Sequence, residues 1–182
     1  RSLTELLQTG DVLVDIDPKF PQAIGIRSIL SLLLMFGNFT WDILINRVDD
    51  SPFFTSDFPV AIEETADPRI LNRIIPLAPQ LAIRIRPDPS VDRTRSDFSF
   101  RDFRRNIRGL DRSQVASINR RIVRCAETMV FFRDNSPWVP AFVRKNAGFR
   151  IESTTKRIPH GTGTMLWFTK EIRETRRGVN GT

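Results

Sequence analysis

Apolar and polar residues alternate over several short stretches of the chain, and this period of two predicts β-strands with two different faces. The first clear stretch spans residues 41–46. One of its sides would carry Trp41, Ile43 and Ile45, and the other would carry Asp42, Leu44 and Asn46. A second stretch, residues 81–86, alternates between large aliphatic residues and Ala82, Arg84 and Arg86. It predicts a half-buried strand whose outer face is basic.

Two longer segments have the spacing of helices. Apolar residues between 21 and 38 fall almost all round a helical wheel, which predicts a helix buried on every side. Between 111 and 128 the apolar residues form a single stripe with the arginines off it, so this helix should be amphipathic. Asp111 and Gln114 have the spacing of a capping box at its start. Cys125 lies on the stripe and is interpreted as a small core residue.

These elements predict an α+β fold in one domain, residues 1–177, with a flexible tail at 178–182. The sheet should be mostly antiparallel and packed against the buried helix 21–38 and the amphipathic, Arg-rich helix 111–128. Pro59 cannot donate a ladder hydrogen bond, so strand pairing should break there. The strands are expected near residues 41, 53, 60, 74, 81, 129, 151 and 164.

The polar corner before Pro59 holds the first candidate functional residues, Ser56 and Asp57. Their short side chains could bond nearby backbone amides and stiffen a turn. Alternatively, Asp57 is a catalytic carboxylate at a strand end, with Ser56 as its hydrogen-bonding partner. It would then act as a general base, or bind Mg²⁺ or Ca²⁺ together with another acid. The acids nearest in sequence are Asp49, Asp50, Glu63 and Glu64.

The same corner lies in a longer motif. A tryptophan-bearing strand is followed by Phe-x-Thr-Ser-Asp-x-Pro-Val and then by Pro-Leu-x-Pro. The residues in these positions are Trp41, Phe53 or Phe54, Thr55, Ser56, Asp57, Pro59, Val60, Pro76, Leu77 and Pro79. Further along, Asn119 lies on the second predicted helix. On these residues the chain resembles the bacterial domain-of-unknown-function family 4238, over residues 20–135.

Two features depart from that family's pattern. Phe58 stands where the family commonly has asparagine, and the His-rich segment that opens its members has no counterpart here. The resemblance therefore implies either the later part of a longer protein or a divergent member. It implies an architecture more than an activity.

Positive charge is concentrated in one window of the chain. The net charge is +7, and lysine contributes only four residues. Between 101 and 124 there are eight arginines and two aspartates. Guanidinium groups suit bidentate phosphate contacts, so the window predicts either a solvated surface or a contact with nucleic-acid phosphates. The arginines are Arg101, Arg104, Arg105, Arg108, Arg112, Arg120, Arg121 and Arg124.

Composition excludes several kinds of site. The single cysteine and single histidine cannot form a disulfide or a Cys/His zinc site. There is no Gly-Lys-Ser/Thr loop and no GxGxxG motif. We therefore expect no haem, flavin, NAD or zinc, and the cofactor is unknown, with Mg²⁺ or Ca²⁺ possible at carboxylates. The longest apolar run is too short to cross a membrane, so no membrane contact and a cytoplasmic location are expected.

Three functions follow from these patterns. The leading hypothesis is a nucleic-acid-associated module whose Arg-rich face contacts phosphates. The second is a hydrolase or nuclease-like enzyme with an acidic site around Asp57. The third is a module that binds another protein or a missing upstream segment, through an apolar patch near Phe98, Phe100 and Phe103.

Overall fold

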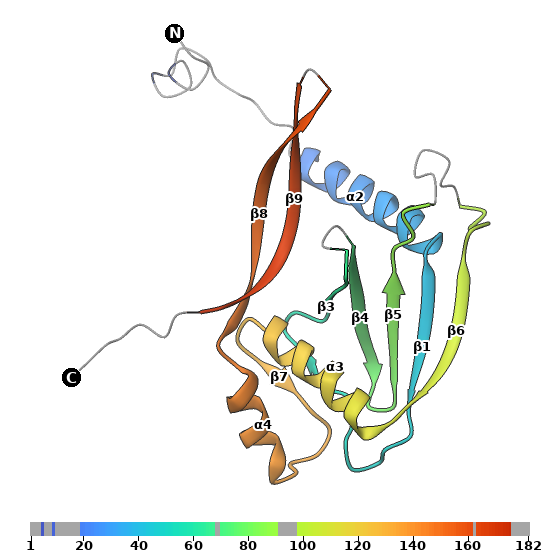
Figure 1. Ribbon diagram of the computed structural model, residues 1–182, viewed down its shortest axis with the longest axis vertical. Helices are drawn as coiled ribbons and strands as arrows, with labels where there is room; N and C mark the ends of the chain where they lie inside the picture. Colours follow the sequence, from blue (N-terminus) through green and yellow to red (C-terminus); the bar gives the residue numbers. More distant parts are fainter. Residues whose placement is uncertain are drawn as a thin grey trace.

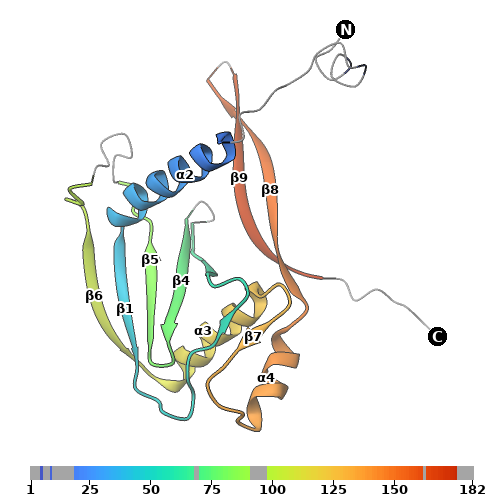
Figure 2. The same ribbon diagram turned by 180° about the vertical axis from the view of Figure 1, so that it is seen from behind.

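The computed structural model describes Glu5, Thr9 and residues 19–67, 70–90, 98–161 and 163–175. The predicted tail and most of the first eighteen residues of the predicted domain lie outside the described residues. The elements, shown in Figures 1 and 2, are α2 (Phe20–Gly37), β1 (Thr40–Asn46), β2 (Thr55–Ser56), β3 (Ala61–Glu64), β4 (Leu71–Ala78), β5 (Leu81–Arg86), β6 (Arg104–Leu110), α3 (Arg112–Cys125), β7 (Val130–Phe131), α4 (Trp138–Asn146), β8 (Phe149–His160) and β9 (Gly163–Glu174).

The α+β class is confirmed, and the main sheet is mostly antiparallel. Its strand order is β3-β4-β5-β1-β6, in which β6 pairs parallel with β1 and the other neighbours are antiparallel. The prediction of one sheet for all strands is wrong. β2 and β7 form a separate two-stranded ribbon, and β8 and β9 form a separate hairpin. Pairing does break at Pro59, because β2 and β3 on either side of it belong to different sheets.

Strand β6 was not predicted from the sequence. Its residues, Arg-Arg-Asn-Ile-Arg-Gly-Leu, hold too few apolar positions to alternate, and six of the seven are exposed. The sequence pattern of this segment does not favour a strand. The segment joins the sheet because it pairs with β1. This strand places part of the basic window at the sheet edge.

Helix α2 forms where it was predicted, but the prediction that it is buried is wrong. Ile26 and Ile29 are 60% and 65% exposed, and Leu30, Leu32 and Leu33 are also exposed. Its last turn contacts the sheet, where Trp41 Nε1 donates to the Phe36 carbonyl over 2.9 Å. Apolar residues all round a helix show that burying the helix would be energetically favourable. They do not show that the rest of the chain buries it.

Helix α3 covers part of one face of the main sheet and contributes to the core. Its buried residues Val115, Ile118 and Ile122 join one hydrophobic cluster with sheet residues including Leu44 and Ile74. Fully burying each such side chain stabilises the fold by about 1.5–3 kcal/mol. The predicted capping box is confirmed: Asp111 and Gln114 each accept a hydrogen bond from the other's backbone amide over 2.9 Å. Cys125 is buried in this core, as predicted.

Strand register divides the sheet into two faces. We call the face that carries Asp42 and Leu44 the α3 face, and the one that carries Trp41 and Ile43 the α2 face. Register places Asp42 beside Arg84 and Asn106, so the basic side of β5 is on the α3 face, where Arg84 is 21% exposed and Arg86 is 40% exposed. The α3 face of β1 is fully buried at Asp42, Leu44 and Asn46, whereas Trp41, Ile43 and Ile45 are half-buried.

The remaining elements extend from this body. Helix α4 follows the β2–β7 ribbon, and Trp138 on it stacks on Phe54 at 5.7 Å between ring centroids. The long β8–β9 hairpin runs beside the β3–β4 side of the sheet and reaches past the start of α2 in both views (Figures 1 and 2). Among the described residues, no helix has the length and apolar character needed to span a membrane.

Candidate functional site

The carboxylate of Asp57 is held by a segment 70 residues away in sequence. Asp57 Oδ1 accepts from the Glu127 amide at 3.0 Å, and Oδ2 accepts from the amides of Thr128 and Met129 at 2.7 and 3.0 Å. The Thr128 hydroxyl donates to Oδ2 at 2.5 Å. This hydroxyl first, and then the three amides, lower the pKa of Asp57 from 3.8 to about 2. The side chain is therefore ionised at neutral pH.

These contacts make Asp57 a latch between the β2 corner and the loop after α3. Its own amide also donates to the Met129 carbonyl over 3.2 Å, beside the β2–β7 pairing. Ser56 does not bond this carboxylate; its hydroxyl donates to the Phe58 carbonyl at 2.6 Å. Backbone amides do bond the Asp57 side chain, as the turn prediction expects. These amides, however, belong to residues 127–129 and not to the turn itself. The catalytic role predicted for Ser56 and Asp57 stays a prediction.

The acids near Asp57 in sequence do not gather around it. Asp50 pairs with Arg112 at 2.7 Å, and Glu63 belongs to a different cluster on the α3 face. Across the described ranges, no group of three or more His, Cys, Asp or Glu side chains is placed to hold a metal ion. A divalent ion at Asp57 therefore gains no support from its surroundings.

Asn119, another residue of the recognised motif, is fully buried and joins α3 to the segment before β2. Its Nδ2 donates to the Pro52 carbonyl at 2.8 Å, and its Oδ1 accepts from the Phe54 amide at 3.0 Å. Both backbone groups would otherwise be unpaired in the core. Thus Asn119 holds the beginning of the segment 52–57 through its backbone, and Asp57 holds the end of that segment through its own side chain.

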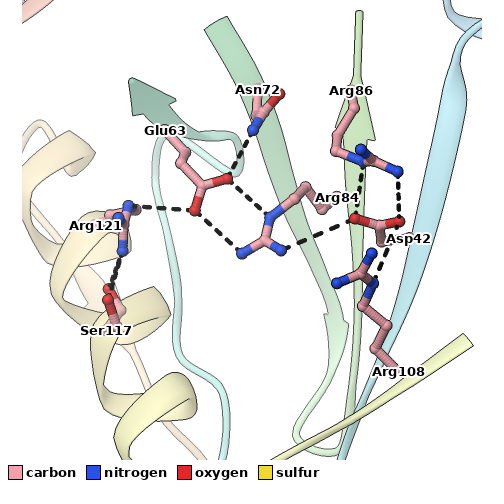
Figure 3. A network of polar contacts seen from close by, with 8 residues as sticks. All are labelled: Asp42, Glu63, Asn72, Arg84, Arg86, Arg108, Ser117 and Arg121. Carbon is pink, nitrogen blue, oxygen red and sulfur yellow. Dashed lines mark hydrogen bonds and ion pairs between the residues drawn. The ribbon is translucent and has the colours of Figure 1, made fainter. Parts of the chain in front are cut away.

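A larger polar network occupies the α3 face, with Asp42 at one end (Figure 3). The Asp42 side chain is only 2% exposed. Arg86 contacts both of its oxygens, with Nη2 at 3.2 Å from Oδ1 and Nε at 3.0 Å from Oδ2. Asn106 Nδ2 donates to Oδ1 at 2.9 Å, and Arg108 Nε lies 3.7 Å from the same atom. Three strands, β5, β1 and β6, thus converge on one buried carboxylate.

Glu63 forms the other end of the network. Arg84 pairs with it through Nε at 2.8 Å and Nη2 at 3.1 Å, while Arg84 Nη1 lies 3.9 Å from Asp42. Arg84 therefore links the two carboxylates. Asn72 donates to Glu63 at 2.9 Å, and Arg121 of α3 lies 3.7 Å from it. The polar row runs from α3 across all five strands of the sheet.

Positive charge exceeds negative charge in this network. Two carboxylates face four guanidinium groups, those of Arg84, Arg86, Arg108 and Arg121. The side chains of Arg86 and Arg108 are 40% and 54% exposed, whereas Arg84 is 21% exposed. The acids therefore lie beneath the arginines, and the surplus positive charge faces solvent. We call these four residues the sheet arginines.

The structure divides the eight arginines of the basic window. Arg108 and Arg121 are sheet arginines, and Arg104 lies on the same face of β6. Arg105 points to the opposite face because it alternates with Arg104 along the strand. The remaining four lie on or beside other elements: Arg101 precedes β6 and bonds Ser99, Arg112 pairs with Asp50, Arg120 is exposed on α3, and Arg124 stacks on Phe149.

Two of the three phenylalanines predicted to form an apolar patch are exposed, and two of the three make contacts within the chain. Phe98 and Phe103 are exposed, and Phe103 makes an edge contact with Trp41 at 5.6 Å. Phe100 packs so closely on Gly37 that a Cβ at residue 37 would overlap its ring. This loop therefore fixes the end of α2 to the sheet, while Phe98 remains open to solvent.

Sequence reasoning missed the centre of the polar network. The alternation placed Asp42 on the side of β1 opposite Trp41, Ile43 and Ile45 and gave it no function. It placed Arg84 and Arg86 on an outer face. A usable signal was present, since an acid in one alternating strand and two arginines in another can be neighbours in a sheet. Which strands are adjacent, however, is decided by the fold.

Of three comparisons with known proteins, only the one with family models found a match. Neither the curated proteins nor the solved structures contain a match to the chain. A family model, described as protein of unknown function DUF4238, matches residues 3–136. That range includes the main sheet, α3 and the latch, and it ends before α4 and the hairpin. By this match over most of its length, the chain belongs to the DUF4238 family of proteins of unknown function.

Proposed function

We propose that this protein binds the phosphate backbone of a nucleic acid on the α3 face of its main sheet. The observation that carries the proposal is the surplus of guanidinium groups over carboxylates in the sheet arginines, with Arg86 and Arg108 reaching solvent. Guanidinium groups bind phosphate oxygens through paired hydrogen bonds. The arginines named here differ from the predicted window, because Arg84 and Arg86 come from β5.

The layout of the sheet arginines favours a polymer over a small anion. The polar row that they belong to crosses five strands, which are four steps of about 4.8 Å, or about 19 Å in all, and the arginines occupy its α3 end and its β5 and β6 strands. A nucleic-acid strand rises about 3.4 Å per nucleotide, so the polar row is as long as about five to six nucleotides. Contacts to phosphates carry no base information, so binding should be independent of sequence and strongly salt-dependent.

The buried acids have a positioning role in this proposal. Arg84 is held between Glu63 and Asp42, and Arg86 is held against Asp42. Immobilising a long side chain on binding costs about 0.5–1.5 kcal/mol, and here the folded protein has already immobilised these guanidinium groups. The carboxylates thereby reduce the conformational entropy that the arginine side chains would lose on binding a phosphate.

The experiment compares two double variants with the same change in charge. Arg86→Gln with Arg108→Gln removes two sheet arginines, whereas Arg150→Gln with Arg173→Gln removes two exposed arginines of the hairpin. Binding of a labelled 12-nucleotide DNA or RNA is measured by fluorescence anisotropy from low to moderate salt. We expect the first variant to lose affinity and to reduce the log–log salt slope by about 0.7–0.9 per lost contact.

The hairpin variant should keep nearly the affinity and slope of the unmodified protein. Equal losses in both variants would show that net charge alone attracts the nucleic acid. No binding to single-stranded or duplex probes at low salt would remove the proposal. Circular dichroism of both variants verifies that they remain folded.

A further inference from the structure

Strand β6 presents an open edge of the main sheet. It pairs with β1 on one side and is the last strand in the sheet order. Among the described residues, no backbone group is hydrogen-bonded to its other side. In a parallel pair every second residue directs its amide and carbonyl away from the partner strand. The edge therefore offers unpaired donors and acceptors to another extended segment.

The side chains of β6 determine which kind of added strand would be complementary to this edge. Arg104, Asn106 and Arg108 lie on the α3 face, and Arg105 and Ile107 lie on the α2 face. The strand holds three arginines and no acid, and Ile107 is 71% exposed. Acidic residues on one side of an added strand would complement Arg104 and Arg108. An apolar residue on its other side would cover Ile107.

A second copy of this chain is a poor occupant of the same edge. Edge-to-edge pairing of two β6 strands would bring two sets of three arginines together, and like charges opposite one another destabilise a strand pair. Arginines on an exposed edge thus exclude self-association while they select an acidic strand. Charge complementarity therefore identifies the occupant as a different, acidic segment.

We infer that the outer edge of β6 binds an extended acidic segment of another protein by strand addition. In the bound state, main-chain hydrogen bonds provide the affinity, and alternating side chains provide the specificity. The segment carries Asp or Glu opposite Arg104 and Arg108, and Val or Ile beside Ile107. This inference does not rest on nucleic-acid binding. Because Arg108 belongs to both sites, the acidic strand and a nucleic acid compete at this corner.

The test uses a fluorescent peptide, Glu-Val-Glu-Val-Glu-Val-Glu, titrated with the full chain and followed by anisotropy. Two control peptides keep its charge: one is N-methylated at every internal amide, and one has the four Glu residues followed by the three Val residues. We expect the alternating peptide to bind and each control to bind about tenfold more weakly. Binding of the N-methylated peptide at full affinity would show charge attraction without strand addition and would overturn the inference.

Variants of the protein locate the bound peptide. Arg104→Gln and Ile107→Thr, both on β6, should weaken binding several-fold, and Ile107→Thr keeps a β-branched residue in the strand. Arg120→Gln is the matched control, because Arg120 is an exposed arginine on α3 away from the edge. Equal weakening by Arg104→Gln and Arg120→Gln, or no binding of the alternating peptide, would overturn the inference.

The two proposals can fail separately. The peptide assay contains no nucleic acid, and Arg121→Gln, which lies on α3 and contacts Glu63, should leave peptide affinity unchanged while it reduces nucleic-acid affinity. Loss of peptide binding in Arg121→Gln would place the peptide on the sheet arginines and refute strand addition at β6.

Discussion

Two aspartates, Asp42 and Asp57, are held in opposite ways. Asp57 is exposed, and three backbone amides and one hydroxyl of a single loop hold it. Asp42 is buried, and side chains from two neighbouring strands hold it. The first fastens a loop to a corner, while the second sets the positions of arginines at a surface. An acid that stands out in a motif can therefore be bonded mainly to backbone, while one within an ordinary strand can organise an arginine-rich surface.

Asp42→Ala tests this comparison most strongly, because we expect it to lower the free energy of unfolding more than the other variants do. The change leaves Arg86 and the amide of Asn106 without their buried partner, and removing one member of a buried ion pair costs about 3–5 kcal/mol. We expect a loss near the lower end of that range, because Arg86 and Arg108 can turn to solvent. Urea denaturation at neutral pH measures it. A loss below 1 kcal/mol would mean that the network does not require its acid.

Asn119→Ala should have the next largest effect. It leaves the Pro52 carbonyl and the Phe54 amide unpaired in the core, at about 1–3 kcal/mol for each orphaned group. We expect a total loss of about 3 kcal/mol. Asn106→Ala is a useful comparison, since Asn106 bonds a side chain rather than the backbone. Denaturation of Asn119→Ala at the unmodified midpoint would contradict the bridging role.

Asp57→Asn should cost less, since water can solvate the donors of an exposed carboxylate, and its signature is in the pH dependence. The pKa of Asp57 is about 2 in the folded protein against an ordinary 3.8. The ionised group therefore stabilises the fold fully above the ordinary value, and this contribution is lost as pH falls toward 2. We expect the variant to lose less unfolding free energy than the unmodified protein on acidification. Parallel acid-titration curves would show that the latch contributes nothing.

Ser56→Ala should have the smallest effect. The buried hydroxyl donates to the Phe58 carbonyl, and losing one such bond costs about 1 kcal/mol. Since this hydroxyl does not bond Asp57, the dependence of stability on pH should match that of the unmodified protein. A changed acid titration in Ser56→Ala would couple the two residues after all and restore the predicted partnership.

Local patterns predicted the elements better than their packing. The capping box at Asp111 and the break at Pro59 depend on groups within a few residues, and the core position of Cys125 follows from the apolar stripe of its own helix; each is confirmed. The burial of α2 and the single sheet depend on contacts with distant segments, and both predictions are wrong. β6 lacked a local signal altogether, since its strand conformation is stabilised by pairing with β1.

The candidate site shows the same division. Sequence motifs identified Asp57 and Asn119 as notable, and charge counting identified arginine as the main positive group. They could not place Arg84 of β5 between Glu63 of β3 and Asp42 of β1, because strand order and register are set by the packing of the whole sheet.

The sequence by itself determined the α+β class, most strands and helices, the cap of α3 and the excess of arginine. The reason is that propensity, periodicity and charge are properties of short segments. Only the tertiary structure decided which face of the sheet is covered and which acids meet which arginines. Those relations arise from long-range pairing, in which residues such as Asp42 and Arg86 become neighbours only once β1 and β5 are joined.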